Sequence, residues 1–369
     1  MINLQKTAAT VLGVAALSLL VAACGSSTNT TSSGTTSKTP VASATISGAG
    51  STFAAPVYEQ WGSQLASAGL TVNYQAVGSG AGITALAGKT VDFGASDPPL
   101  KAAEATELAK VGEPVQIPMF LGAITVSYNL PGVQAGLKLE GTTIANIYLG
   151  KIKTWNAPEI KALNPGVTLP STAITVVHRS DSSGTSAGFT GFLAAVDPEW
   201  ASKVGSGKIV PWPVGTGAKG NAGVAGAVEQ TPGAVGYVEQ AYALTHKFTY
   251  ADVKNKAGNF VAPTLASTSA AAEGIVLPAS LAFAIKNPSS PQAYPITSQT
   301  FVVVYKDMCK AGVPGGKSAA EGVVKFLDYG LGAGQAILAK ADYATLPATI
   351  LAKSKAAVAG LTCEGAALS

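Results

Sequence analysis

One short segment constrains this chain more than any other, because an arginine leaves a strand-like run just before a helix start rich in hydroxyl groups. The β-branched run at residues 173–177 predicts a strand, and Arg179 follows it. Residues 183–185 (Ser-Gly-Thr) then open a segment with Phe189 and Phe192 at helical spacing. Helix N-termini favour negative charge, and a guanidinium matches tetrahedral oxyanions in bidentate fashion. The segment therefore predicts a cradle for a phosphate-like anion, although Ser and Thr are also ordinary helix caps.

The same order of strand, small-residue turn and helix recurs earlier in the chain. Residues 48–56 lead into a helical pattern, and residues 77–83 follow the strand-like residues 70–74. Residues 91–99 place Asp97 at the end of an apolar run. Each turn offers polar groups at the carboxyl end of a strand, where ligands bind in open α/β sheets.

Further strand-like runs lie at residues 114–118, 121–128, 174–177 and 300–305, between amphipathic stretches. Such alternation predicts an α/β fold with a mostly parallel sheet. About 325 residues follow residue 44, which is enough for two domains with cores of their own.

Taken together, these segments resemble the substrate-binding proteins of bacterial phosphate ABC importers. The matching segments recur in the family's order and cover residues 48–53, 91–97, 148–155, 179–186, 232–239 and 295–298. The resemblance implies a periplasmic-binding-protein-like fold of type II, in which two discontinuous domains joined by a hinge enclose a central cleft. It also implies a monomer without cofactor that delivers inorganic phosphate to a membrane-embedded permease with its ATPase.

The resemblance implies these boundaries as well. Domain I would comprise residues 45–121 plus 300–369, and domain II residues 122–299. The chain would cross between them near residues 120–125 and 295–301.

The residues that the family uses on phosphate carry over position by position. The resemblance assigns phosphate to the side chains or backbone N–H groups of Thr52, Phe53, Ser79, Asp97, Arg179, Ser183, Gly184 and Thr185. Asp181 would hold the Arg179 guanidinium in place, or cap the following helix, or both.

Asp97 carries the argument for selectivity. A carboxylate facing an anion is unfavourable unless the anion brings a proton to donate, as hydrogen phosphate does and sulfate does not. Sites built around a substrate hydroxyl can reject analogues that lack it by roughly 10⁴–10⁵. The alternatives are that Asp97, which precedes two prolines, only shapes a turn, or that the site takes another oxyanion such as sulfate or molybdate.

The chain begins with features of an exported lipoprotein. Residues 1–23 are interpreted as a signal peptide, with an apolar run behind Lys6. The Val-Ala-Ala-Cys ending resembles a lipobox and makes Cys24 the lipidated residue, although an ordinary cleavage site beside an incidental cysteine is the alternative. Residues 24–44 are rich in Ser, Thr and Gly, so we expect a flexible tether and an extracytoplasmic protein anchored to the cell membrane.

Composition and the remaining cysteines bear on nucleic-acid binding, disulfide formation and metal binding. The formal net charge of +4 is spread along the chain without a Lys/Arg run, which argues against nucleic-acid binding. Cys309 and Cys363 predict one disulfide in an exported protein, with two buried free thiols as the alternative. Two histidines and no Cys-x-x-Cys leave no expected metal site.

Two motifs point toward other chemistry and are set aside. Residues 184–188 fit G-x-S-x-G with His178 and Asp181 nearby, but Ser186 falls inside the expected helix and not on a nucleophile elbow. Residues 215–220 fit G-x-G-x-x-G, yet the Pro-Trp-Pro before them favours a loop over a dinucleotide site. A surface-bound phosphatase would need a nucleophile and metal set that the sequence does not offer.

Overall fold

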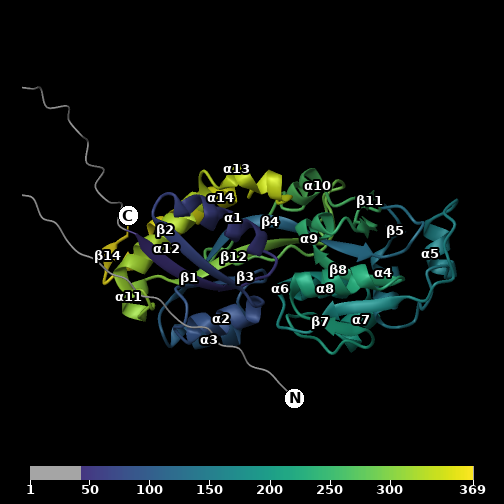
Figure 1. Cartoon of the computed structure of the whole chain (residues 1–369), viewed down its shortest axis with the longest axis horizontal. Coiled ribbons are helices and arrows are strands. Elements are labelled where there is room, and N and C mark those ends of the chain that lie inside the picture. Colours follow the sequence, from purple (N-terminus) through teal and green to yellow (C-terminus); the bar gives the residue numbers. More distant parts are fainter. Residues whose placement is uncertain (1–42, 369) are drawn as a thin grey trace, which may run out of the picture. The chain divides into compact units, whose positions relative to one another are not determined.

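The computed structural model describes residues 43–368, and a mixed nine-stranded sheet runs through this part of the chain (Figure 1). The strand order is β2-β1-β3-β12-β4-β8-β6-β7, with β9 paired to β4. The chain therefore passes from one end of the sheet to the other and returns through β12.

One end of the sheet contains the first three strands, which are parallel to one another. Strand-helix alternation builds this end, because each parallel strand needs a crossover back over the sheet. The elements are β1 (Ala44–Gly50), α1 (Ala55–Ala66), β2 (Leu70–Ala76), α2 (Ser79–Ala87), β3 (Phe93–Ser96) and α3 (Ala102–Ala109). Helix α1 buries Val57, Trp61 and Leu65, the positions that show helical spacing in the sequence.

Two long strands cross the middle of the sheet, β4 (Pro114–Tyr128) and β12 (Thr297–Tyr305). They pair antiparallel, and the register shifts at Thr300/Phe301, opposite Phe120 and Pro118. The separate strands expected at residues 114–118 and 121–128 are thus one strand. Pro118 lacks the N–H that a regular ladder requires, and it is accommodated at this irregularity.

The other end of the sheet is built from β6 (Thr175–Arg179), β7 (Thr216–Ala218) and β8 (Ala234–Glu239). Strand β6 pairs parallel with β7 and β8, whereas β8 pairs antiparallel with β4. The expectation of a mostly parallel sheet is wrong at the centre, where β12 is antiparallel to both β3 and β4. Alternation along the sequence reveals strands but not the direction in which a returning strand pairs.

Short helices and a small three-stranded sheet of order β11-β10-β5 surround this second end. The helices are α4 (Gly141–Tyr148), α5 (Pro158–Leu163), α6 (Gly184–Val196), α7 (Pro198–Lys203), α8 (Gly220–Gln230), α9 (Gln240–Thr245) and α10 (Leu265–Ala270). The short strands are β5 (Lys138–Leu139), β9 (Thr249–Tyr250), β10 (Asp252–Lys254) and β11 (Phe260–Val261).

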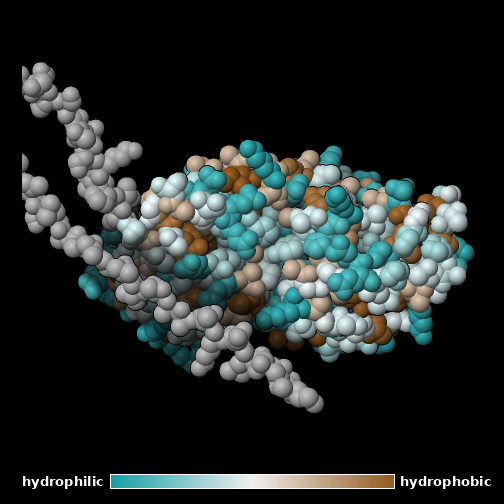
Figure 2. All heavy atoms as spheres, viewed as in Figure 1, coloured by the Kyte–Doolittle hydropathy of each residue, from teal (hydrophilic) through white to brown (hydrophobic). Residues whose placement is uncertain are grey.

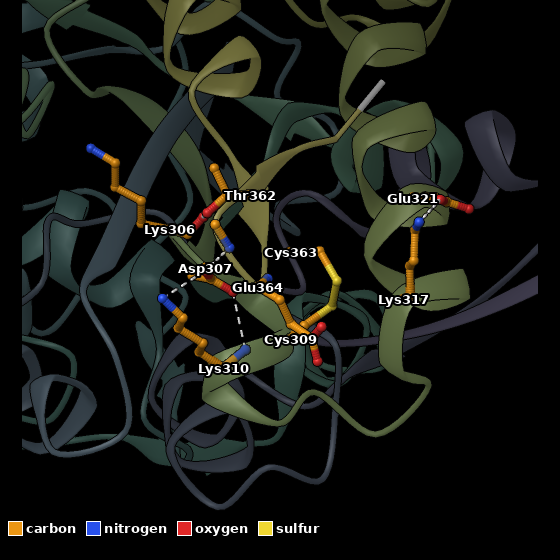
Figure 3. The surroundings of a disulfide bond; sticks show 10 residues. Lys306, Asp307, Cys309, Lys310, Lys317, Glu321, Thr362, Cys363 and Glu364 are labelled. Atoms are coloured by element: carbon orange, nitrogen blue, oxygen red, sulfur yellow. Dashed lines mark hydrogen bonds and ion pairs between the residues drawn. A yellow bond between two sulfur atoms is a disulfide. The ribbon is translucent and has the colours of Figure 1, made fainter.

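After β12 the chain returns to the first end of the sheet. It forms α11 (Met308–Ala311), α12 (Gly316–Leu331), α13 (Gln335–Leu338), the 3₁₀ turn η1 (Ala339–Ala341), α14 (Ala348–Ala359), β13 (Thr362–Cys363) and β14 (Ala366–Ala367). A disulfide joins Cys309 of α11 to Cys363 of β13 (Figure 3). Asp307, beside it, accepts hydrogen bonds from the N–H groups of Lys310, Glu364 and Gly365, so the C-terminal strands are tied to α11 twice.

We call β1–β3 with α1–α3 and α11–α14 the first lobe, and β6–β8 with α4–α9 the second lobe (Figure 1). Each lobe has its own aromatic cluster: Trp61 packs on Phe120 and Phe326 in the first, and Tyr237 packs on Phe189 and Trp212 in the second. The exact domain boundaries expected from the sequence stay a prediction, since residues 43–368 group as one compact unit.

Several expectations concern the start of the chain. The expected signal peptide (residues 1–23), Cys24 and nearly all of the expected tether lie outside the described residues. Ala44, the last residue of the expected tether, is the first residue of β1. None of the helices found in residues 43–368 is long and apolar enough to cross a bilayer.

Candidate functional site

The first lobe gathers four of the expected site residues at one edge of its sheet. Thr52 and Phe53 follow β1, Ser79 is the first residue of α2, and Asp97 follows β3. Because β1 and β3 are parallel neighbours, their carboxyl ends meet at the same edge. All four side chains are buried, with at most 6% of any of them exposed.

The second lobe supplies the other four expected residues from a single turn. Arg179 ends β6, and Ser183 is the N-cap of α6, where its hydroxyl accepts a 3.0 Å hydrogen bond from the N–H of Ser186. Gly184 and Thr185 form the first turn of that helix. The N–H of Arg179 donates to the hydroxyl of Tyr237 at 3.0 Å, which fixes the arginine backbone to the aromatic cluster of this lobe.

The two sets lie directly against each other where the lobes meet. A Cβ atom on Gly184 would collide with the carboxylate of Asp97 and the hydroxyl of Ser79, so only glycine fits there. The N–H of Gly80 donates to the carbonyl of Ser182 at 3.0 Å, a direct backbone contact between α2 and the turn before α6. All eight expected residues are brought together in this one buried region.

Asp97 is held by neutral hydroxyl groups. Its Oδ1 accepts from Ser51 Oγ at 2.5 Å and from Thr300 Oγ1 at 3.0 Å, whereas Oδ2 has only Ser79 Oγ, at 3.3 Å. Oδ2 is also the oxygen that lies against Gly184. Burial raises the pKa of Asp97 to about 6, although its hydrogen bonds and the charge of Arg179 act in the opposite direction.

Arg179 is the single arginine of the chain, and its side chain is 1% exposed. Its Nε and Nη2 donate to the two oxygens of Asp181 at 2.7 and 2.5 Å, and its Nη1 donates to Thr185 Oγ1 at 3.3 Å. Burial alone would raise the pKa of Asp181, but the hydrogen bonds and charge of Arg179 hold it below its ordinary value. Asp181 also accepts from the N–H of Gly220 at 3.1 Å, so the pair is locked to the start of α8.

Backbone donors complete the site. Within residues 43–368, the N–H groups of Phe53, Gly184 and Thr185 donate to no protein acceptor. A buried N–H without a partner is costly, and groups of this kind at a helix N-terminus are suited to an anion. The arrangement as a whole offers many donors, one guanidinium and one carboxylate oxygen, and it can hold a tetrahedral oxyanion that carries a proton.

Several residues of the site have no signal in the sequence motifs. Asn221 at the start of α8 donates to Thr52 and Thr185, and Gln299 donates to the carbonyl of Asp97 at 2.6 Å. Ser51 and Thr300 bind Asp97 Oδ1, as described above. Ser51 lies in the segment 48–56, and Gln299 and Thr300 lie in the expected crossing segment 295–301, but the sequence assigns none of the three a role at the site.

A buried carboxyl group, that of Glu239, is linked to the backbone carbonyl of Phe53 through Tyr343. Tyr343 Oη lies 2.6 Å from both the carbonyl oxygen of Phe53 and Oε2 of Glu239. A hydroxyl has one proton and a carbonyl only accepts, so both contacts are hydrogen bonds if the carboxyl of Glu239 is protonated. Burial raises the pKa of Glu239 well above its ordinary value, in agreement with a neutral acid at this position.

The structure also locates the G-x-G-x-x-G and G-x-S-x-G motifs of the sequence. The expectation of a loop at residues 215–220 is wrong, because Thr216–Ala218 is β7 and Gly220 begins α8, whose N-terminus borders the site. Ser186 Oγ hydrogen-bonds Tyr237 Oη at 2.6 Å, while His178 stacks on Trp212, so serine and histidine do not form a dyad. In the described part of the chain, no cluster of three His, Cys, Asp or Glu side chains could hold a metal ion.

A pocket of about 220 Å³ lies beside the site and between the same two lobes. Lys101, Lys208 and Lys286 are among the residues that line it, together with Gln299. Lys208 is 4% exposed and reaches Glu104 of the first lobe at 2.6 Å, which adds an ion pair between the lobes. None of the eight expected anion-binding residues lines this pocket, so it is a neighbour of the site.

Comparison of the sequence with known families places the chain clearly. Residues 28–332 match the family described as "PBP superfamily domain". The phosphate-binding protein PstS of Pasteurella multocida is 40% identical over 316 residues, which cover 85% of this chain and 89% of that protein. The phosphate-binding protein PstS3 of Mycobacterium bovis is 35% identical over 371 residues, covering 94% of this chain and 96% of the relative.

Solved structures agree on the fold. A phosphate-binding protein from Stenotrophomonas maltophilia superposes with a TM-score of 0.68 at 22% identity, over 87% of this chain and 98% of the other. A high-affinity periplasmic phosphate-binding protein (PfluDING) bound with phosphate gives a TM-score of 0.67 at 22% identity, over 86% and 98% of the two chains. The periplasmic-binding-protein-like fold expected from the sequence is confirmed.

Proposed function

Because this chain belongs to the family of the PstS phosphate-binding proteins, within the PBP superfamily, we propose that it binds inorganic phosphate outside the cytoplasm and delivers it to an ABC permease for import. The residues proposed to bind phosphate are the eight that the site brings together: Thr52, Phe53, Ser79, Asp97, Arg179, Ser183, Gly184 and Thr185.

The observation that carries this proposal is that Asp97 of the first lobe lies against the turn of the second lobe that carries Arg179 and Gly184. Arg179, the free N–H groups and the hydroxyls can satisfy unprotonated oxygens of an anion. Asp97 Oδ2 can satisfy only an oxygen that donates a proton. Hydrogen phosphate has both kinds of oxygen, whereas sulfate and molybdate at neutral pH have no proton for Asp97, so the site favours phosphate over them.

Burial of the site implies that the protein opens to take up its ligand. With side-chain exposures of at most 6%, an anion cannot reach these residues unless the lobes separate. We propose that residues 45–121 with 300–369 and residues 122–299 move as two domains about β4 and β12, which connect them. An anion that contacts both lobes stabilises the closed form, and the permease can distinguish that form from the open one.

The proposed location follows from the start of the chain. Cys24 would carry the lipid, and the Ser/Thr-rich segment after it would let the domain reach the permease from the membrane surface. The face seen in Figure 2 intersperses hydrophilic residues with small apolar areas. We propose that the protein acts as a single copy. We expect the variant Cys24→Ala to appear in the soluble fraction of a bacterial host, and retention on the membrane would contradict the anchor.

Calorimetric titration of the soluble domain tests the ligand. The domain, residues 43–369, is refolded free of ligand and titrated at pH 8 with phosphate, arsenate and sulfate. We expect tight binding of phosphate, binding of arsenate because it shares the shape and the proton, and no signal with sulfate. Comparable binding of sulfate and phosphate, or no binding of phosphate, would overturn the proposed ligand while leaving the fold intact.

A further inference from the structure

Asn221 lies between the two lobes at the start of α8, and its side chain is fully buried. Its Nδ2 donates to Thr52 Oγ1 of the first lobe at 2.9 Å and to Thr185 Oγ1 of the second lobe at 3.1 Å. Its backbone N–H also points to Thr52 Oγ1, at 3.3 Å. One amide group therefore joins two hydroxyls that belong to opposite walls of the site.

The orientation of this amide is determined by its other end. Asn221 Oδ1 accepts a 2.9 Å hydrogen bond from the backbone N–H of Glu239. A backbone N–H can only donate, so the oxygen of the amide must face Glu239 and the nitrogen must face the two threonines.

Hydrogen-bond capacity then dictates what the two threonines can do. A hydroxyl has two lone pairs and one proton. Thr52 Oγ1 accepts from the N and the Nδ2 of Asn221, and Thr185 Oγ1 accepts from Asn221 Nδ2 and Arg179 Nη1. Both lone pairs of each hydroxyl are thus used, and across residues 43–368 neither hydroxyl donates to a protein acceptor.

We propose that Asn221 is a positioning residue that makes Thr52 and Thr185 obligatory donors and aims both protons at an unprotonated oxygen of the bound anion. This inference rests on the proposed function and deepens it. Asn221 does not need to touch the anion, since its effect passes through the two hydroxyls. Because Thr52 and Thr185 lie on different lobes, the residue also makes the full donor set available only when the lobes are together.

The arrangement divides the site into faces with fixed roles. The hydroxyls held by Asn221, the guanidinium and the free N–H groups all donate, whereas Asp97 Oδ2 is the carboxylate oxygen that faces them and can only accept. A ligand that satisfies every face has unprotonated oxygens on the donor side and one protonated oxygen on the Asp97 side. That description fits a hydrogen-bearing tetrahedral oxyanion such as hydrogen phosphate or hydrogen arsenate.

The variant Asn221→Asp tests the proposal with little change in size. Its carboxylate keeps an acceptor for the N–H of Glu239 but replaces Nδ2 with an oxygen, so both threonines donate to it and not to the anion. We expect phosphate affinity to fall by at least about 100-fold, since two hydrogen bonds to a charged ligand are lost. Asn221→Ala removes the donor without adding charge, and for it we expect a loss of about tenfold.

A double-mutant cycle separates positioning from a structural role. Thr52→Val in the otherwise unchanged protein should weaken phosphate binding about tenfold, because one donor is lost. The same change in the Asn221→Asp protein should cost less than about twofold, because the hydroxyl no longer serves the anion there. Equal costs in both backgrounds would overturn the proposal.

A matched control is Asn255→Ala. Asn255 is also a buried asparagine, but its Nδ2 donates to the carbonyls of Pro291 and Ala293 outside the site. This variant should lower the melting temperature without weakening phosphate binding. Phosphate binding by the unchanged protein together with unaltered binding by Asn221→Asp would overturn the role of Asn221 alone. Failure of the unchanged protein to bind phosphate would remove the proposed function and this inference with it.

Discussion

The two aspartates that border the site, Asp97 in the first lobe and Asp181 in the second, have the same side chain in opposite surroundings. Asp181 accepts hydrogen bonds from Nε and Nη2 of Arg179, and the pKa of its carboxyl lies below the ordinary value. Asp97 receives hydroxyl groups only, and burial raises its pKa to about 6. Asp181 has its charge neutralised and serves to orient a cation. In the proposed function, Asp97 Oδ2, which has only the long contact from Ser79 Oγ, accepts a hydrogen bond from the protonated oxygen of the ligand. On this proposal a carboxylate selects only where no cation occupies it.

The difference also shows why the lobes contribute unequal chemistry. In the proposed function, the second lobe supplies the positive charge that would attract any oxyanion, together with the helix start at Gly184. The first lobe supplies the carboxylate proposed to discriminate between oxyanions. Affinity and selectivity are therefore separable, and substitutions on the two sides should give different phenotypes.

The largest loss of phosphate affinity is expected from substitutions of Arg179. Arg179→Gln removes the charge and the bidentate donor and leaves the half-buried Asp181 without its partner, so phosphate affinity should fall by about a thousandfold. Arg179→Lys keeps the charge without the planar fork and should lose less, about 30-fold. Calorimetric titration measures both, and an affinity of Arg179→Gln within tenfold of the unchanged protein would argue against the anion site.

The next effect concerns selectivity. Asp97→Asn places an amide donor where a proton acceptor stood, so sulfate should gain binding and phosphate should lose it. We expect the ratio of phosphate to sulfate affinity to fall by at least about 100-fold. Competition between the two anions at pH 8 measures this ratio, and an unchanged ratio would show that selectivity lies elsewhere.

The third effect is a pH dependence of stability in the ligand-free protein. The pKa of Asp97 is about 6 in the folded state and 3.8 ordinarily, so the folded protein holds this proton more tightly than the unfolded chain does. Its contribution to the free energy of unfolding is therefore greatest below pH 4 and is lost as the pH rises through 6, by about 3 kcal/mol in total. Denaturant unfolding of the unchanged protein and of Asp97→Asn between pH 4 and 7 isolates this contribution. A difference between the two that does not vary with pH would contradict it.

The smallest effect is expected at the partner of the arginine. Asp181→Asn keeps the size of the side chain and part of its hydrogen bonding to Arg179 and Gly220. Phosphate affinity should change by no more than about tenfold, since weaker orientation of Arg179 is offset by the loss of a nearby negative charge. The preference for phosphate over sulfate should be unaltered. A shift in preference as large as that of Asp97→Asn would remove the distinction between the two aspartates.

The residues of the site that could be predicted from the sequence are those in turns that end a strand. Thr52, Ser79, Asp97 and Arg179 each follow an apolar run and stand beside glycine, serine or proline, which marks a turn at a strand end. Thr300 lies inside an apolar strand and reaches Asp97 only because β12 pairs antiparallel with β3, 203 positions away in sequence. Asn221 follows a glycine-rich stretch that was expected to be a loop, and its contact with Thr52 spans 169 positions. Long-range pairings of this kind leave no local pattern, so their partners could not be inferred from periodicity or turn chemistry.

The irregularity in the crossing strands has a mechanical consequence. The register of β12 against β4 shifts between Thr300 and Phe301, and an antiparallel ribbon bends most readily where its ladder is interrupted. Thr300 is also one of the two hydroxyl donors to Asp97 Oδ1. In the proposed opening, flexing of the ribbon at this point would move the hydroxyl that holds the carboxylate of Asp97. Opening of the lobes would then turn the carboxylate of Asp97 away from the anion. The motion that exposes the anion would also weaken the hydrogen bond between its proton and Asp97. Release of the anion would therefore need no change in protonation.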